Sequence, residues 1–415
     1  MWFYVQHILI PYERAEAALH DRPRGNLSDL YPRWLGAREL LLHHRDPYSS
    51  QVTREIQEGY YGRAIDPSRP YDPKDQQAFA YPLYVVFLLA PTVFLPFAVV
   101  QTGFFWLLLA LCAASVLIWL RVLGWHVSSA TTAIFLILTL GSFPAVQGLK
   151  LEQLSLLVCG LVAGSALLLM SGHLCLAGFL LALATIKPQL TLPFAGWLLL
   201  WALAKWKEWQ NLAWGFGGTM AVLLTGSEIL SPGWIHRFGD AVNAYQQYTA
   251  GRGSALDVLI GGLITSAGVK LLAATVVLGT VAVCWIMRRQ PAGSLQFNLA
   301  SSLVLAATVV IIPTFAPYNQ LLLLPGIFLL VQNYTKFWRG NWLTKACLAL
   351  CGLVLLWPWL AAMALTVASA VFPAEAVQKE WQLPLYTSLE IPIAVLAVLA
   401  VYAARELTAG KKRLA

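Results

Sequence analysis

The chain has 415 residues, of which 58% are hydrophobic and only 12% are charged, and its formal net charge is +8. Soluble globular proteins carry about a quarter charged residues, because their surface faces water. The mean hydropathy of +0.65 therefore excludes a soluble enzyme, a nucleic-acid-binding protein and a disordered scaffold, and it indicates a membrane protein with several spans.

Eleven apolar runs are long enough to cross, or nearly cross, the roughly 30 Å hydrocarbon core of a bilayer. Three of them, 174–187, 189–204 and 318–334, are short and need neighbours to shield their ends. The proline-punctuated stretch 81–96 is expected to dip into the membrane, and 255–268 is too short to cross. We therefore predict an all-α polytopic membrane protein with about eleven transmembrane helices. The eight remaining runs are 97–120, 127–143, 154–171, 210–230, 269–287, 296–313, 346–366 and 387–404.

The charged residues are unevenly placed along the chain. Residues 11–80 contain ten Lys or Arg and eleven Asp or Glu. The turns on one side of the predicted bundle carry twelve Lys or Arg, against six on the opposite side. Because Lys and Arg favour cytoplasmic loops, the C-terminus is expected inside and the polar segment 11–80 outside, at the periplasmic face of the plasma membrane.

The start of the chain, Met1–Ile10, is apolar but too short to span, and it lacks the features of a signal peptide. We interpret it as part of a truncated first transmembrane helix. Three parts are predicted: 1–80 with the truncated helix and an external loop of amphipathic helices, 81–404 as the transmembrane domain, and 405–415 as a basic cytoplasmic tail. All six cysteines fall in apolar runs and no metal-ligand spacing is present, so neither a disulfide framework nor a metal site is predicted.

The external loop contains the first candidate for chemistry. Residues 26–49 are predicted to form an amphipathic helix on the outer membrane surface, with Arg33 and Glu39 facing away from the apolar stripe. Asp29 stands immediately before this helix. Either Asp29 or Ser28 is expected to cap the helix, while Asp29 is also suited to act as a general base at the water–lipid boundary. Asp46, in an Asp-Pro-Tyr turn, is the fallback base but fits an Asx-turn better.

Further polar residues fall on the same predicted membrane face. Gln147, Glu152 and Gln153 form a turn between two apolar runs and are suited to binding hydroxyl groups, although a solvated turn has the same composition. Lys187, before Pro188, is suited either to reach the lipid headgroups or to neutralise a lipid phosphate. Other candidates for binding a phosphate or a sugar on this face are His236 and Arg237, in a predicted loop over 234–253, and Asn319.

These pieces, in this order, resemble glycosyltransferase family 87 of the GT-C superfamily, over roughly residues 26–335. The resemblance depends on five motifs, of which the last is the most characteristic: Asp29-Leu30-Tyr31; Arg45-Asp46-Pro47-Tyr48; Ala80-Tyr81-Pro82-Leu83; Gln147-Gly148 with Glu152-Gln153; and Leu176-Ala177-Gly178 with Ile186-Lys187-Pro188. Some members look as if they carry a His-His stretch at the start of a late span. The comparable segment here, 313–320, has no histidine, so no role is transferred from it.

The resemblance implies transfer of a hexose or pentose from a polyprenyl-phosphate donor to a hydroxyl of a glycolipid or glycan at the outer face of the membrane. By analogy Asp29 maps onto the catalytic carboxylate, which deprotonates the acceptor for an inverting displacement, and Lys187 lies near the donor phosphate or supports the fold. No metal or other cofactor is implied, and no nucleic-acid partner. The alternatives are a polytopic lipid or sugar transporter or flippase, and a non-catalytic membrane scaffold.

Overall fold

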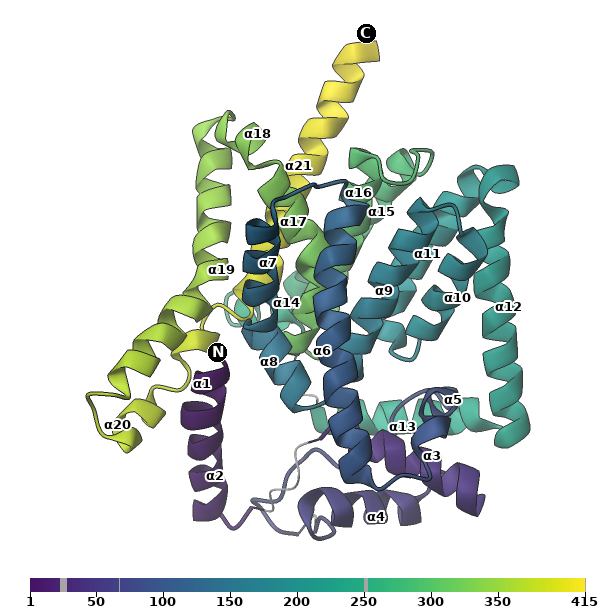
Figure 1. Ribbon diagram of the computed structural model, residues 1–415, viewed down its shortest axis with the longest axis vertical. Coiled ribbons are helices and arrows are strands. Elements are labelled where there is room, and N and C mark those ends of the chain that lie inside the picture. The colour runs from purple at the N-terminus through teal and green to yellow at the C-terminus, as the bar shows by residue number, and fades with distance from the viewer. Residues whose placement is uncertain (23–27, 67, 250–252, 415) are drawn as a thin grey trace.

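The computed structural model describes residues 1–22, 28–66, 68–249 and 253–414, and within these residues it contains helices and no strand (Figure 1). Most of the helices run side by side in one bundle. Three helices, α3 (Tyr31–His43), α4 (Ser50–Tyr61) and α13 (Trp234–Thr249), instead lie across one end of it. The C-terminal helix α21 (Glu390–Leu414) projects from the opposite end. The bundle therefore has one end covered by crosswise helices and one end formed by connecting turns.

Four helical segments are long and apolar enough to cross a membrane: 97–122, 266–287, 342–368 and 374–408. A fifth span forms if α7 (Ser129–Leu140) and α8 (Phe143–Lys150), which meet at 55°, are counted together. Shorter apolar helices complete the bundle: α9 (Leu154–Met170), α10 (Leu174–Ala184), α11 (Pro188–Ala204) and α16 (Leu295–Ile311). The prediction of a polytopic, all-helical membrane protein is thus confirmed.

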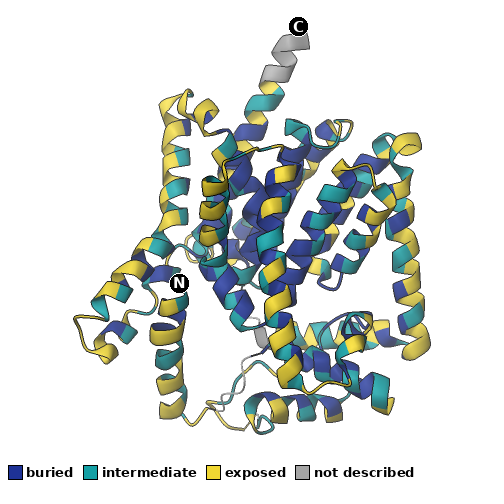
Figure 2. Cartoon of the chain, in the orientation of Figure 1, coloured by how far each residue is buried: buried dark blue, intermediate teal, exposed yellow. Residues whose placement is uncertain are grey.

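The shorter helices are shielded by their neighbours. Fourteen consecutive residues of α16, from Phe297 to Val310, are buried, so this helix lies at the centre of the bundle. Helices apolar on all sides are expected in such a place. The run predicted at 318–334 is a 3-10 turn (Pro317–Leu323) followed by the nine-residue helix α17 (Leu324–Gln332). Figure 2 shows the buried residues concentrated in the central helices and exposed ones on the outer helices.

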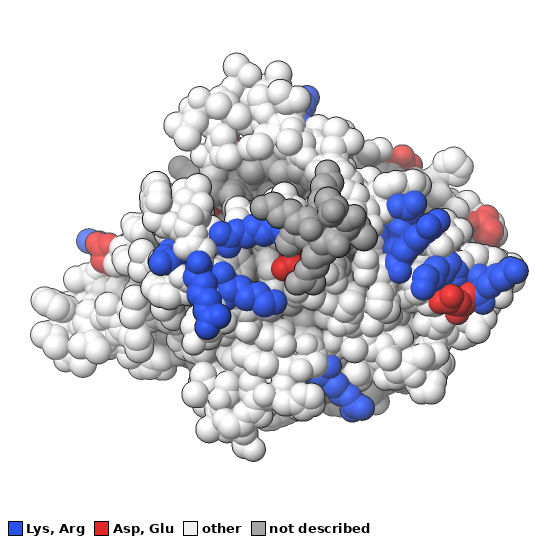
Figure 3. All heavy atoms as spheres, turned by 90° about the horizontal axis from the view of Figure 1, so that it is seen from above, with Lys and Arg blue, Asp and Glu red and all other residues white. Residues whose placement is uncertain are grey.

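The outer helices present large apolar side chains on the surface. Helix α15 (Ser266–Met287) is only 11% buried over its apolar window, and Leu271, Leu278 and Trp285 are all more than half exposed. Large exposed apolar surfaces of this kind are rare on soluble monomers but are expected where a protein faces lipid. The end from which α21 projects gathers Lys and Arg side chains, as seen from above in Figure 3.

The N-terminal residues 2–19 are continuously helical, as α1 (Trp2–Tyr4), a π-helical turn (Val5–Leu9) and α2 (Ile10–Leu19). Tyr4 and Ile8 are buried against Phe143 of α8 and Leu365 of α19 (Trp342–Ala368). The Tyr4 hydroxyl also donates to the main-chain carbonyl of Trp381. The apolar start of the chain is therefore packed against the bundle.

Helix α3 differs from its prediction. Neither Ser28 nor Asp29 caps it: Leu30 is at the N-cap, and no side chain caps the first turn. Glu39, predicted to face away, is buried at 7% exposure and pairs with Arg45 at 2.8 Å. The helix packs against α4 and against the 81–96 segment, which contains α5 (Val85–Leu89), so it is covered by protein on more than its apolar stripe. Residues 26 and 27 of the predicted helix lie outside the described residues.

Helices α10 and α12 (Trp206–Leu230) approach each other so closely that glycine is required at their contact. A Cβ atom added at Gly178 would lie 2.3 Å from the carbonyl oxygen of Leu212, and one added at Gly215 would lie 2.1 Å from that of Cys175. Close backbone approach through small residues is a common mode of helix packing in membranes. The crossing fixes α10, whose C-terminal end leads into Lys187.

We expect Gly178→Leu to lower the stability of the folded protein in detergent by at least about 2 kcal/mol, because both backbones must separate. Gly217→Leu is the matched control, since an added Cβ at Gly217 has no neighbour within 4 Å. The measurement is thermal unfolding of both variants and the wild type in the same detergent. Equal melting temperatures for the two variants would contradict a tight crossing.

Candidate functional site

A cavity of about 770 Å³ opens at the end of the bundle that the crosswise helices cover. Ligand pockets of ~300–1,000 Å³ are typical of enzymes that bind small molecules. Its polar lining comes from six separate segments of the chain: Asp29, Arg33, Asp75, Gln77, Tyr81, Gln147, Gln153, Lys187, Gln189, Asn243, Tyr245, Gln246, Thr314, Tyr318 and Asn319.

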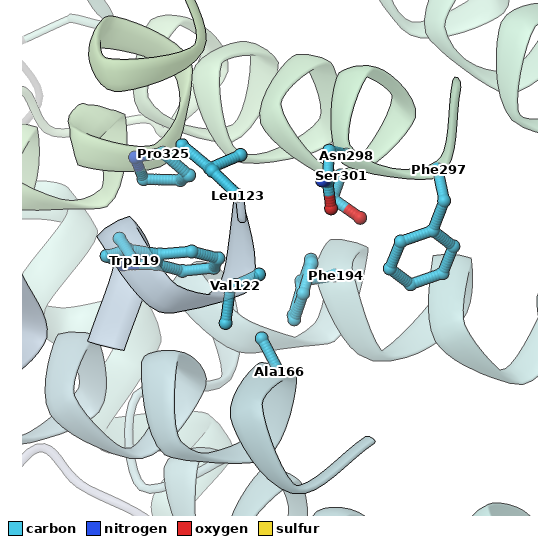
Figure 4. A pocket seen from close by; sticks show the side chains of 9 residues that line it. All are labelled: Trp119, Val122, Leu123, Ala166, Phe194, Phe297, Asn298, Ser301 and Pro325. Carbon is cyan, nitrogen blue, oxygen red and sulfur yellow. The ribbon is translucent and has the colours of Figure 1, made fainter. Parts of the chain in front are cut away.

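A second cavity, between Trp119, Phe194, Asn298 and their neighbours, holds only about 10 Å³ (Figure 4). That is room for one water molecule. The large cavity is therefore the candidate substrate site.

Asp29 stands at the cavity wall on the segment that leads into α3. Its main-chain N–H donates to the carbonyl of Leu151 at 2.8 Å, which attaches this segment to the turn between α8 and α9. Its side chain, half-buried and lining the cavity, accepts a hydrogen bond from the Gln153 amide. Burial raises the pKa of the Asp29 carboxyl, against the opposing effects of the Arg33 and Lys187 charges. A carboxylate with a raised pKa is suited to accept a proton.

Lys187 owes its position to the proline after it. Pro188 begins α11, and the residue before a proline is disfavoured in the α conformation, so α10 ends at Ala184 and Lys187 adopts φ −118° and ψ 83°. Its side chain is buried at 7% exposure and lines the cavity. The ammonium donates to Gln153 Oε1 at 2.8 Å and to Ser155 Oγ at 2.7 Å. It also lies over the rings of Tyr81 and Tyr318, 5.7 and 5.3 Å from their centroids.

One amide joins the two charged groups. Gln153 Nε2 donates to the Asp29 carboxylate while Gln153 Oε1 accepts from Lys187. The orientation of the amide follows, because a carboxylate can only accept and an ammonium can only donate. Ser155 Oγ, which also accepts from Lys187, donates in turn to Asn319 Oδ1 at 2.8 Å. A hydrogen-bonded chain thus runs along the wall from Asp29 to Asn319.

The turn that presents Gln153 has an unusual backbone. Glu152 adopts φ +46°, a left-handed conformation for which glycine is favoured, and Gln153 N–H donates back to the carbonyl of Gly148 at 2.8 Å. The Glu152 side chain is buried at 5% exposure behind the cavity wall, where it accepts a hydrogen bond from Gln101 Nε2 at 3.2 Å. Glu152, predicted to bind substrate, therefore does not line the cavity; its side chain contacts Gln101 of α6 (Phe97–Val122), next to the turn that carries Gln153.

Burial raises the pKa of Glu152 from 4.5 to about 7. The folded state then binds a proton more tightly than the unfolded state, so this residue contributes stability below about pH 4.5 that is lost as the pH rises through about 7. We expect the melting temperature to fall less for Glu152→Gln than for the wild type between about pH 5 and about pH 8. Asp29 acts in the same direction in both proteins and cancels. Thermal unfolding at several pH values measures the difference, and parallel curves would contradict it.

Two predicted site residues lie elsewhere. The segment predicted as a loop over 234–253 is the helix α13, with residues 250–252 outside the described residues. His236 is exposed on this helix and does not line the cavity. Arg237 pairs with Asp46 at 3.2 Å and donates to Ser231 Oγ at 2.6 Å. The Asp46 side chain also accepts from the main-chain N–H of Tyr48, as expected of an Asx-turn.

The opposite face of α13 contributes to the cavity, although no residue of this face was among the predicted site residues. Phe238, Val242 and Tyr245 recur at helical spacing and line the cavity. Arg33, predicted to face away from the apolar stripe of α3, also lines the cavity. The spacing of the aromatic and apolar residues in α13 was the signal that indicated a helix there.

Comparison with known proteins identifies the family. The model of glycosyltransferase family 87 matches residues 79–313, which is more than half of the chain. No curated protein matches the chain. No solved structure matches it either. The match covers the segments with Tyr81, Gln153 and Lys187, while Asp29 and Asn319 lie beyond its two ends. The chain belongs to glycosyltransferase family 87 and is a membrane-embedded glycosyltransferase rather than a transporter.

Proposed function

We propose that this protein transfers a sugar from a polyprenyl-phosphate donor to a hydroxyl group of a glycolipid or glycan, with inversion at the anomeric carbon. One observation carries the proposal: the Asp29 carboxylate and the Lys187 ammonium line one cavity and are joined by the single amide of Gln153. Displacement of a sugar from a phosphate requires a base for the acceptor hydroxyl and a cation for the phosphate. Asp29 and Lys187 supply these two groups in the same cavity.

In the proposed step, Asp29 takes the proton of the acceptor hydroxyl while the hydroxyl oxygen forms a bond to the anomeric carbon. The bond from that carbon to the phosphate oxygen breaks, and its electron pair stays on the polyprenyl phosphate. The Lys187 ammonium stabilises the negative charge that the phosphate gains. Gln147 and Asn319, which also line the cavity, are proposed to bind sugar or phosphate oxygens. His236 and Arg237 have no part in this proposal.

The cavity end of the bundle is proposed to face the outside of the plasma membrane. Lys and Arg side chains gather at the opposite end, from which α21 projects (Figure 3), and basic turns favour the cytoplasm. Within residues 1–80, the loop that follows the first helix then lies outside, and 81–404 form the membrane domain. A lipid-linked donor reaches the cavity from the membrane plane, so no nucleotide is needed on the outer side.

We expect the rate of transfer to fall as the pH is lowered through the raised pKa of Asp29, because only the carboxylate form accepts a proton. The acid limb should therefore lie above the pKa of an exposed aspartate, which is about 3.9. Transfer of radiolabelled sugar, measured across pH with saturating donor, tests this. A rate that stays constant down to about pH 4 would argue against the Asp29 carboxylate as the base.

The test of the function itself is a panel of radiolabelled polyprenyl-phosphate sugars offered with a membrane extract as the source of acceptor. Transfer from one donor that depends on Asp29 supports the proposal and identifies the sugar. If nucleotide sugars were used instead, with no transfer from any polyprenyl donor, the proposed donor class would be wrong.

A further inference from the structure

A second cation lines the cavity, and the reaction proposed above gives it no task. The Arg33 guanidinium donates from Nη1 to the main-chain carbonyl of Asp29 at 2.7 Å, and its Cζ lies 4.5 Å from the centroid of the Tyr81 ring. Its Nε is buried and has no hydrogen-bond partner within the described part of the chain. A buried guanidinium N–H without an acceptor is unusual in a folded protein.

Lys187 and Arg33 differ in what they can still bind. Lys187 has three N–H donors, two of which are bonded to Gln153 and Ser155. Arg33 has five donors in a planar fork that matches phosphate and carboxylate oxygens. Among the described residues, one hydrogen bond from this guanidinium is seen, and no ion pair involves it. Arg33 is therefore the cation of the cavity with the larger capacity for a bound anion.

A carboxylate of the protein itself does not fill that role. Asp75 lines the same cavity, but its Oδ1 accepts from the main-chain N–H of Gln77 at 3.1 Å, and it forms no ion pair with Arg33. The negative charge of Asp75 interacts with Arg33 at a distance, but its oxygens do not accept hydrogen bonds from the guanidinium.

The position of Arg33 indicates which substrate brings the anion. In an inverting displacement the base and the leaving group act from opposite faces of the sugar ring. Arg33 donates a hydrogen bond to the main-chain carbonyl of Asp29 and so lies next to the base, the side from which the acceptor hydroxyl approaches in the proposed step. Lys187 is linked to the Asp29 carboxylate only through the amide of Gln153.

We propose that Arg33 forms an anion-binding subsite for the acceptor, and that the acceptor carries a phosphate or carboxylate group close to the hydroxyl that is glycosylated. This inference rests on the proposed function, because it takes Asp29 as the base. Tyr81, which also lines the cavity, supports the guanidinium through a cation–π contact.

The first test identifies the charge of the acceptor. A membrane extract is separated by anion exchange into an unretained and a retained fraction, and each is offered to the wild-type enzyme with the donor found in the panel above. Asp29-dependent transfer into the retained, anionic fraction is expected. Transfer into the unretained fraction alone overturns the subsite while leaving the proposed function intact. Loss of the Asp29 dependence would instead overturn the proposed function.

The second test identifies the residue. With the anionic fraction as acceptor, Arg33→Gln is expected to raise the KM for the acceptor roughly 10- to 100-fold, with a smaller effect on kcat, and Arg33→Lys should recover part of the affinity. Arg38→Gln is the matched control, because Arg38 lies on the same helix, over the Trp34 ring and outside the cavity. A purely structural role of Arg33 predicts a loss of kcat and melting temperature with the KM unchanged, and that result would overturn the proposal.

Discussion

Replacement of Asp29 by asparagine is expected to reduce sugar transfer by about 10²- to 10⁴-fold, the contribution that a positioned general base usually makes. Asparagine has nearly the same shape, and its carbonyl can still accept the hydrogen bond from Gln153. The variant should therefore fold and bind both substrates while lacking a group that accepts the proton. Transfer of radiolabelled sugar from the polyprenyl-phosphate donor is the measurement.

Asp240→Asn is the control for this substitution, because Asp240 is exposed on α13 and does not line the cavity. Its activity should match that of the wild type. If Asp29→Asn retained most of its activity with an unchanged melting temperature, Asp29 would not be the base. Asp75, the other carboxylate that lines the cavity, would then be the next residue to replace.

Replacement of Lys187 by methionine is expected to lower kcat/KM for the polyprenyl-phosphate sugar by about 10²- to 10³-fold. Removing a hydrogen-bonding group that stabilises a developing negative charge has an effect of this size in other enzymes. Methionine fills a similar volume without a charge. Its introduction also leaves Gln153 Oε1 without its donor, which costs about 1–3 kcal/mol of stability, whereas Ser155 Oγ keeps its hydrogen bond to Asn319. Both steady-state kinetics and thermal unfolding should be measured.

Lys150→Met is the control that separates the local effect of the Lys187 ammonium from the overall positive charge of this end of the bundle. Lys150, at the end of α8, donates to Gln6 Oε1 at 2.7 Å and lies over the Trp2 ring, outside the cavity. This control removes a positive charge from the same end of the bundle, so it should lower donor affinity little. Equal losses of donor affinity in both variants would mean that the overall charge of this end, rather than the Lys187 ammonium, attracts the donor phosphate.

Much of the fold was predictable because apolar composition alone determines which segments are helical in a membrane. Each of the eleven predicted runs is helical over most of its length. Their number as full spans was not predictable, since α9 and α16 have only 17 residues each and depend on neighbours that a hydropathy profile does not reveal. The N-terminal segment and α13 were harder to predict from the sequence. Their helices pack on other parts of the protein as well as facing lipid or water, so a hydropathy profile does not reveal them.

The parts of the site formed by ionisable residues at the membrane face were predictable, because such residues have few structural roles there. Asp29 and Lys187 follow from that argument together with the family motifs, and the structure places both in one cavity. The choice between Glu152 and Gln153 was not accessible, because it depends on the left-handed backbone of Glu152, which turns one side chain inward and the other behind the wall. Arg33 was not predicted as a site residue, because an apolar stripe on a helix indicates a single buried face. Helix α3 packs against protein on more than one face, and Arg33 lines the cavity.

The hydrogen-bonded chain along the wall has a direction. Every bond in it points away from Lys187: the ammonium donates to Gln153 and Ser155, Gln153 donates to Asp29, and Ser155 donates to Asn319. The carbonyl of Asn319 is engaged by Ser155, so its amide offers N–H groups to anything bound in the cavity. This part of the wall therefore presents hydrogen-bond donors, which match the acceptor oxygens of sugars and phosphates. It disfavours ligand groups that can only donate a hydrogen bond.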